Sequence, residues 1–132
     1  MRYLILNTYR PKDDDIVTLG EILSYEEILV RFEGRTHILD TTIRVLGVED
    51  RTLYRLKYDT MPEGGSRVYV HIDKYLPDDK PGGNLIASFD MLYVMLATVS
   101  VEELVKYVEH PCVRFDSNGI GSLVKYRLQG LI

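Results

Sequence analysis

The stretch that decides the fold is Glu63–Lys80, with the sequence EGGSRVYVHIDKYLPDDK. It begins with a glycine turn, continues as a strand and ends in a charged loop. Apolar residues alternate along the strand with aromatic and ionisable ones, so one face of the strand is apolar and the other is polar. The polar face is either a place for chemistry or an ordinary solvated strand face.

The neighbouring sequence supplies further strands. A turn signal at residues 61–65 separates two runs of strand character, which predicts a β-hairpin. The short apolar run Arg2–Asn7 is typical of a central strand that is buried on both faces. Strands are predicted at Arg2–Asn7, Ile16–Leu19, Arg51–Tyr58, Arg67–Tyr75 and Leu123–Leu128.

Helices are predicted from capping signals and apolar spacing. Capping boxes at Ser24–Glu27 and Ser100–Glu103 start helices that reach Glu33 and Val108. Asp40 is expected to cap a short helix over Thr41–Leu46, and Leu85–Leu96 carries an apolar stripe at helical spacing. We therefore expect a single α/β (or α+β) domain over residues 1–132, with a mixed sheet of about five to six strands flanked by three to four helices.

Composition limits the classes of function. The formal net charge of −4 argues against binding duplex DNA through many phosphate contacts. The single cysteine, Cys112, excludes a disulfide framework and fits a reducing compartment. No signal peptide or membrane span is evident, so we expect a cytoplasmic protein. Glutamine occurs once and arginine outnumbers lysine, which favours a heat-adapted source.

The ionisable residues suggest acid–base chemistry without a metal or a cofactor. The three histidines, His37, His71 and His110, are too dispersed for a metal site. His37 lies at a junction between elements, and Lys74, Tyr75 and Asp78 lie at a strand end. Histidine can move protons and lysine can stabilise phosphate charge. If these segments meet, they form an acid–base site; otherwise the same residues are structural.

The order of these signals resembles the small archaeal-virus proteins that act as type III anti-CRISPR ring nucleases. The similarity extends over most of the chain, except for residues 82–97 and the closing segment. It rests on seven short signals in a shared order. They are a strand ending in asparagine before an aromatic residue, a capped acidic helix, a histidine before a Ser/Thr-rich segment, an arginine-led strand, a Glu-Gly turn, a loop after the next strand and a late acidic helix. In this chain these are Leu6-Asn7-Thr8-Tyr9, Ser24–Glu27, His37 with Thr41 and Thr42, Arg55, Glu63-Gly64, Tyr75-Leu76-Pro77-Asp78 and Val99–Val108.

The resemblance implies a homodimer that binds cyclic tetra-adenylate in the host cytoplasm and counters type III CRISPR signalling. It implies a metal-independent phosphodiesterase in which a ribose 2′-hydroxyl attacks the adjacent phosphate. His37 would then be the general acid, Asp78 would orient a group in the site, and Asn7 would contact the ligand. Residues 82–97 would be an insertion relative to the family.

The chain departs from the family pattern at the loop. The family's arginine falls on Tyr75 and its glutamate falls on Asp78, while Arg10 takes the place of a serine. Lys74 or Arg10 would have to supply the missing positive charge. The sequence therefore leaves two versions open, an enzyme and a protein that only sequesters the messenger. The alternative from another class is a noncatalytic dimeric interaction or nucleic-acid-binding viral protein that keeps the fold without the site.

Overall fold

The computed structural model describes residues 1–8, 16–33, 41–60, 68–75, 85–108 and 120–132. Within these residues, five strands form one sheet in the order β2-β1-β3-β4-β5, and every neighbouring pair is antiparallel. The strands are β1 (Arg2–Thr8), β2 (Ile22–Ser24), β3 (Thr41–Gly47), β4 (Leu53–Thr60) and β5 (Val68–Lys74). The helices are α1 (Tyr25–Phe32), α2 (Leu85–Thr98), α3 (Val101–Val108) and α4 (Ile120–Leu128). The predicted α/β class is confirmed, although the described strands pair antiparallel rather than as a mixed sheet.

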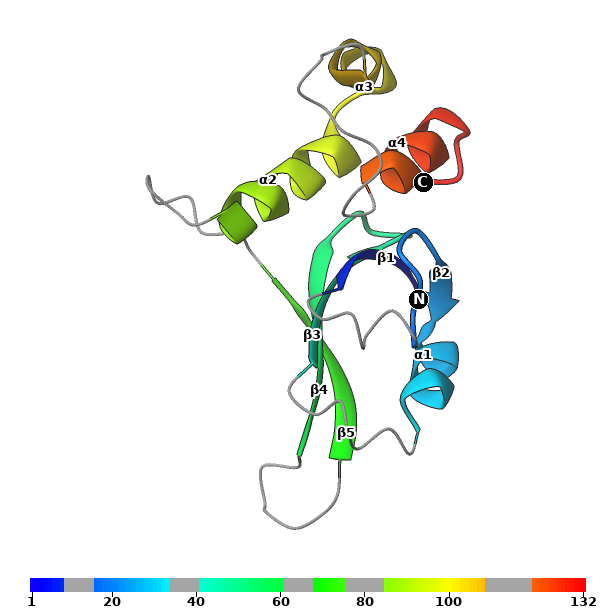
Figure 1. Ribbon diagram of the computed structural model, residues 1–132. Helices are drawn as coiled ribbons and strands as arrows, with labels where there is room; N and C mark the ends of the chain where they lie inside the picture. Colours follow the sequence, from blue (N-terminus) through cyan, green and yellow to red (C-terminus); the bar gives the residue numbers. More distant parts are fainter. Residues whose placement is uncertain (9–15, 34–40, 61–67, 76–84, 109–119) are drawn as a thin grey trace.

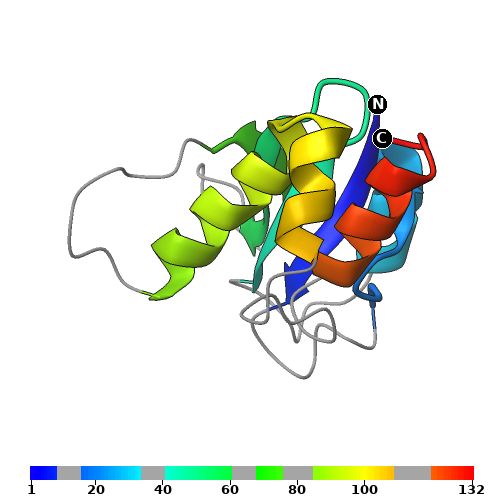
Figure 2. The ribbon, with the colours of Figure 1, turned by 90° about the horizontal axis from the view of Figure 1, so that it is seen from above.

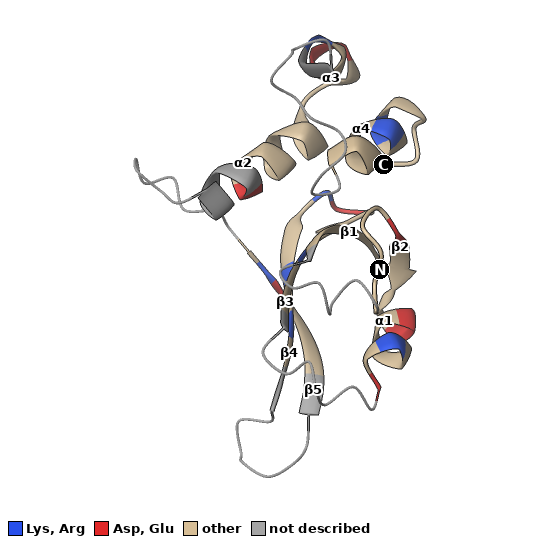
Figure 3. Ribbon diagram, in the orientation of Figure 1, with Lys and Arg blue, Asp and Glu red and all other residues tan. Residues whose placement is uncertain are grey.

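The helices lie on both sides of the sheet. Figure 1 shows α1 beside one face, while α2, α3 and α4 gather at the other side of the strands. Viewed from above in Figure 2, these three helices lie next to one another across that second side. The strands β3, β4 and β5 continue beyond the helices, and Figure 3 shows blue Lys and Arg segments on them below α2. We call the side of α2 and α4 the helical face.

Strand β1 separates two apolar cores, as the sequence predicted. Tyr3 and Ile5 pack with residues of α1, such as Ile28 and Phe32, in the first core. Leu4 and Leu6 point to the helical face and pack in the second core, whose other members include Leu96 and Leu123. Alternate side chains of a strand point to opposite faces, so a run that is apolar throughout requires cover on both sides. The central strand in the sheet order is β3, next to β1.

The predicted hairpin is confirmed as β4 and β5, which pair over Tyr54–Thr60 and Val68–Lys74. A second hairpin, between β3 and β4, turns through residues 48–52. There Arg51 has a φ of 56° and its N–H donates to the Gly47 carbonyl at 2.9 Å. Gly47 itself has no room for a side chain, because a Cβ would meet the Asp50 carboxylate and the Tyr54 ring.

The prediction of a helix over Thr41–Leu46 is wrong, because these residues form β3. Four of its residues, Thr41, Thr42, Ile43 and Val45, are β-branched and fit a pleated surface better than a helix. In the strand, Ile43 and Val45 reach the α1 core while Leu46 reaches the opposite core. Burial on both faces of the sheet decided between the two structures.

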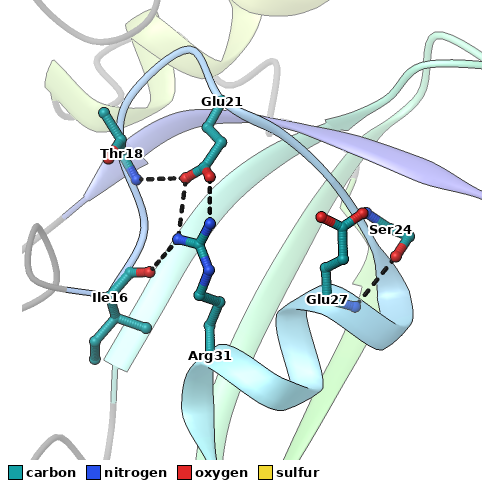
Figure 4. A network of polar contacts seen from close by, with 6 residues as sticks. All are labelled: Ile16, Thr18, Glu21, Ser24, Glu27 and Arg31. Carbon is teal, nitrogen blue, oxygen red and sulfur yellow. Dashed lines mark hydrogen bonds and ion pairs between the residues drawn. The ribbon is translucent and has the colours of Figure 1, made fainter.

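The prediction of a strand over Ile16–Leu19 is also wrong, because these residues lie in a turn before β2. Arg31 of α1 holds this turn in place, as Figure 4 shows: its Nη1 donates to the Ile16 carbonyl at 2.9 Å, and its guanidinium pairs with Glu21. Glu21 also accepts the Thr18 N–H at 3.1 Å. Gly20, with a φ of 83°, allows the chain to reverse.

Three predicted helices are confirmed. The capping box of α1 is complete, since Ser24 Oγ accepts the Glu27 N–H at 3.1 Å and Glu27 accepts the Ser24 N–H at 3.2 Å. The helices α2 and α3 also lie where they were expected, and Ser100 Oγ caps α3 by accepting the Glu103 N–H.

The prediction of a closing strand over Leu123–Leu128 is wrong, because these residues belong to α4. The buried residues Ile120, Leu123, Val124 and Arg127 recur at the spacing of one helix face. Arg127 donates to the carbonyls of Leu96 and Val99 at the end of α2, which joins the two helices. Among the described residues, none of the helices is long and apolar enough to cross a membrane.

Candidate functional site

Polar side chains replace the apolar core at one end of the helical face. Leu46 of β3 and Leu53 of β4 belong to the core under the helices. Two residues away on the same face, Arg44 precedes Leu46 and Arg55 follows Leu53. Registered partners on neighbouring strands share a face. Two rows result, Arg44–Arg55–Asp73 and Thr42–Lys57–His71. We call these six residues, together with Asn7, the polar block.

Asn7 joins the polar block through a β-bulge. The register of β1 and β3 shifts between Ile5, which pairs with Val45, and Asn7, which pairs with Arg44, so Leu6 is the extra residue. The hydroxyl of Tyr93 from α2 donates to the Leu6 carbonyl at 3.4 Å, at the point where the bulge disturbs the ladder. The irregularity therefore places Asn7 beside Arg44.

Arg44 forms a buried ion pair with Asp90 of α2. Arg44 Nε lies 3.1 Å from Asp90 Oδ1 and 3.3 Å from Oδ2, and the two side chains are only 7% and 1% exposed. Burial raises the pKa of the Asp90 carboxyl, while the charge and hydrogen bond of Arg44 and a hydrogen bond from Tyr75 act in the opposite direction. Arg44 Nη1 is also buried, and it has no hydrogen-bond partner within the described part of the chain.

Tyr75 lies against two guanidinium groups. Its ring centroid is 4.4 Å from the Cζ of Arg44 and 5.7 Å from the Cζ of Arg55. These distances are typical of cation–π contacts. Tyr75 packs against the second core and remains partly exposed. The ring, the two cations and the Asp90 carboxylate thus form one connected group where α2 meets the sheet.

The structure brings two of the predicted site residues to the same face and separates a third. Asn7 and Tyr75 both lie on the helical face with Arg44. Lys74 is exposed and is registered opposite Tyr54, which belongs to the core on the α1 side. Lys74 therefore does not join Asn7 and Tyr75. Arg10, His37 and Asp78 lie outside the described residues.

The sequence interpretation missed Arg44 and Asp90 as a site. Each is a lone charge in an apolar run, and this was the available signal, because a charge in such a run must be paired when it is buried. Arg44 was assigned to a helix that is in fact a strand, which hid its pairing with α2. Across the described ranges, no group of three His, Cys, Asp or Glu side chains is placed to hold a metal ion.

The cations of this face are arranged for contact with an anion. Arg55 and Lys57 are partly exposed, lie two residues apart on β4 and share the helical face. Arginine binds phosphate oxygens through paired N–H groups, and lysine binds them as a point charge. Aromatic rings such as Tyr75 stack on nucleic-acid bases. The polar block and Tyr75 together offer groups for both parts of a nucleotide.

Comparisons with known proteins identify no family for this chain. No protein-family model, no curated protein and no solved structure matches this chain. The resemblance to ring nucleases therefore rests on the order of sequence signals alone.

Proposed function

We propose that the protein binds cyclic oligoadenylate, with cyclic tetra-adenylate as the first ligand to test, at the polar block. Two arguments support this function. The order of sequence signals resembles that of viral ring nucleases, and the helical face gathers groups suited to phosphates and adenines. The single observation that carries the proposal is that Tyr75 lies against Arg44 and beside Arg55 on a face that also holds Lys57.

In this proposal, Arg55 and Lys57 contact phosphate oxygens, and Tyr75 stacks on an adenine. Arg44 contacts the ring and is itself held by Asp90. Asn7 lies beside Arg44 and hydrogen-bonds a base edge or a phosphate. The tyrosine at the family's arginine position then does not remove positive charge from the site, because two arginines lie against it.

The proposed chemistry needs no metal ion. A ribose 2′-hydroxyl attacks the adjacent phosphate, His37 protonates the leaving 5′-oxygen, and Asp78 orients a group in the site. We propose further that the protein is a homodimer of viral origin that acts in the cytoplasm of a heat-adapted host. A protein that binds the ligand without cutting it would act by sequestering the messenger.

The test measures binding and cleavage of cyclic tetra-adenylate in buffer with a metal chelator. The informative variants are Tyr75→Ala and the double variant Arg55→Gln/Lys57→Gln, with Lys106→Gln on α3 as a matched control for loss of an exposed cation. Weaker binding is expected for both site variants. For the double variant, the dependence of log Kd on log salt should flatten by about 0.7 for each phosphate that the variant no longer neutralises.

The outcomes separate the versions of the proposal. Cleavage that disappears in His37→Ala supports an enzyme, and binding without cleavage supports sequestration. Unchanged binding in both site variants, or no binding by the wild type, would refute the polar block as the ligand site.

One observation favours the noncatalytic interaction protein as a second candidate. The apolar side chains Val101 and Val105, one turn apart on α3, are 47% and 42% exposed, and Leu128 at the end of the neighbouring α4 is 46% exposed. Val101 and Val105 share one face of α3, which packs on α4. An exposed apolar helix face favours a protein interface. If Val101→Lys/Val105→Lys abolishes self-association while the wild type binds no oligoadenylate, this second function replaces the first.

A further inference from the structure

Strand β5 is the long open edge of the sheet. Among the described strands its one neighbour is β4, and the opposite edge is formed by β2, which has 3 residues against 7 in β5. Sheets protect such edges with short strands, charges, prolines or bulges, because the unpaired backbone groups of an edge pair readily with another chain. The register of β5 with β4 is unbroken from Val68 to Lys74, and β5 contains no proline.

The ladder between β4 and β5 determines which backbone groups point outward. The Tyr75 N–H donates to the Leu53 carbonyl at 2.9 Å, so these two residues form a hydrogen-bonded pair. Such pairs alternate along an antiparallel ladder with pairs that exchange no hydrogen bonds. The N–H and C=O groups of the even-numbered residues from Val68 to Lys74 therefore point away from β4, and they have no hydrogen-bond partner in the described part of the chain.

The side chains along this edge suit a second copy of the chain. When two copies of β5 pair antiparallel and use every outward group, Val70 of one copy lies opposite Ile72 of the other. Both side chains belong to the α1 side, where Val70 is buried and Ile72 packs against the core, so each copy extends the apolar layer of the other. The exposed charges Asp73 and Lys74 then lie opposite the uncharged start of the other β5, and no like charges face each other.

We propose that two copies of the protein form a homodimer by antiparallel pairing of their β5 strands about a twofold axis at His71. The two sheets then form one continuous sheet. This inference rests on the homodimer of the proposed function, for which it names the interface, and not on any ligand. Because the contact is isologous and uses the long edge of both copies, the assembly closes as a dimer and does not continue as a fibre.

The first experiment measures the mass of the full chain by sedimentation velocity, without ligand, over a range of protein concentrations. The wild type should dimerise. Lys74→Pro should weaken the dimer about tenfold or more, because the twofold symmetry removes one outward N–H from each copy. The fold should tolerate this proline, since the Lys74 N–H points away from β4 and the side chain is exposed. Lys74→Ala is the matched control, because it keeps the N–H and should stay dimeric.

A disulfide tests the register without a proline. In the Cys112→Ser background, His71→Cys places two cysteines opposite each other at the twofold axis. The Cα atoms of such a non-hydrogen-bonded pair are about 4.5 Å apart, which a disulfide can span. Oxidation should therefore give a covalent dimer. Asp73→Cys is the control on the same face of β5, because its two copies lie four positions out of register, roughly 13 Å along the strands, and should not crosslink.

Each result decides the inference. A covalent dimer in His71→Cys but not in Asp73→Cys supports it, and this result decides the matter if thermal unfolding shows that Lys74→Pro is unstable. A wild type that is monomeric at every concentration overturns it, and so does a wild-type dimer that His71→Cys fails to crosslink. A dimer that folded Lys74→Pro leaves intact and Val101→Lys/Val105→Lys on α3 dissociates also overturns it.

The interface and the ligand site can fail separately. A monomeric wild type that binds cyclic tetra-adenylate overturns the β5 interface and leaves the ligand site standing. A β5 dimer that binds no oligoadenylate supports the interface and removes the ligand proposal.

Discussion

The ion pair between Arg44 and Asp90 gives the sharpest prediction about stability. Arg44→Met keeps much of the side-chain volume and removes the charge, so the Asp90 carboxyl is left at 1% exposure without its cation. Two charges about 4 Å apart attract by about 4 kcal/mol at an effective dielectric constant of 20. Breaking a buried pair by removing one partner costs about 3–5 kcal/mol. We therefore expect the free energy of unfolding to fall by about 3–5 kcal/mol and Tm by roughly 10–20 °C.

Urea unfolding followed by circular dichroism measures this loss. The matched control is Arg2→Met, because Arg2 pairs with Glu49 at 3.0 Å, nearly the distance of the buried pair, but the two side chains are 57% and 47% exposed. Exposed pairs contribute about 0–1 kcal/mol, so the control should lose little. The contrast between the two variants isolates the effect of burial.

The double variant Arg44→Met/Asp90→Leu completes the test. Replacing both charges by apolar groups removes the unpaired carboxylate, so the double variant should be more stable than Arg44→Met. The reasoning is refuted if the losses of Arg44→Met and Asp90→Leu simply add, because then no interaction joins the two side chains. It is also refuted if Arg44→Met and Arg2→Met lose the same amount.

Three further predictions concern the pH response, a helix cap and a turn. Because burial raises the pKa of Asp90, the folded chain binds this proton more tightly than the unfolded chain. The unfolding free energy of the wild type, measured relative to Asp90→Asn, should therefore rise as the pH falls from neutral through the raised pKa; a fall would show that Arg44 dominates. Ser24→Ala should cost about 1 kcal/mol in urea unfolding, because α1 loses its cap, while Ser24→Thr keeps most of the stability. Gly20→Ala should lower Tm, because Gly20 has a φ of 83° and an added Cβ would lie 2.8 Å from the Cβ of Ser122; an unchanged Tm would show that this turn relaxes freely.

Part of the candidate site was visible in the sequence. The alternation around His71 and Asp73 predicted a strand with a polar face, and Asn7 was expected at a strand end near a ligand. The bulge that turns Asn7 toward Arg44 left no signal, because it depends on the register between β1 and β3. The placement of Lys74 on the opposite face from Asn7 likewise follows from strand pairing and not from its position beside Tyr75.

The sequence by itself determined the elements that local chemistry controls. The capping box of α1, the hairpin of β4 and β5 and the buried character of β1 all follow from side-chain periodicity and turn residues within a few positions. Only the tertiary structure decided between strand and helix for β3 and α4, because each is short and the burial of its apolar side chains outweighs a weak local preference. The pairing of Arg44 with Asp90 and the contact of Tyr75 with Arg44 were likewise decided only by the tertiary structure. A buried charge takes the partner that packing brings to it, and here that partner lies 46 residues away along the chain.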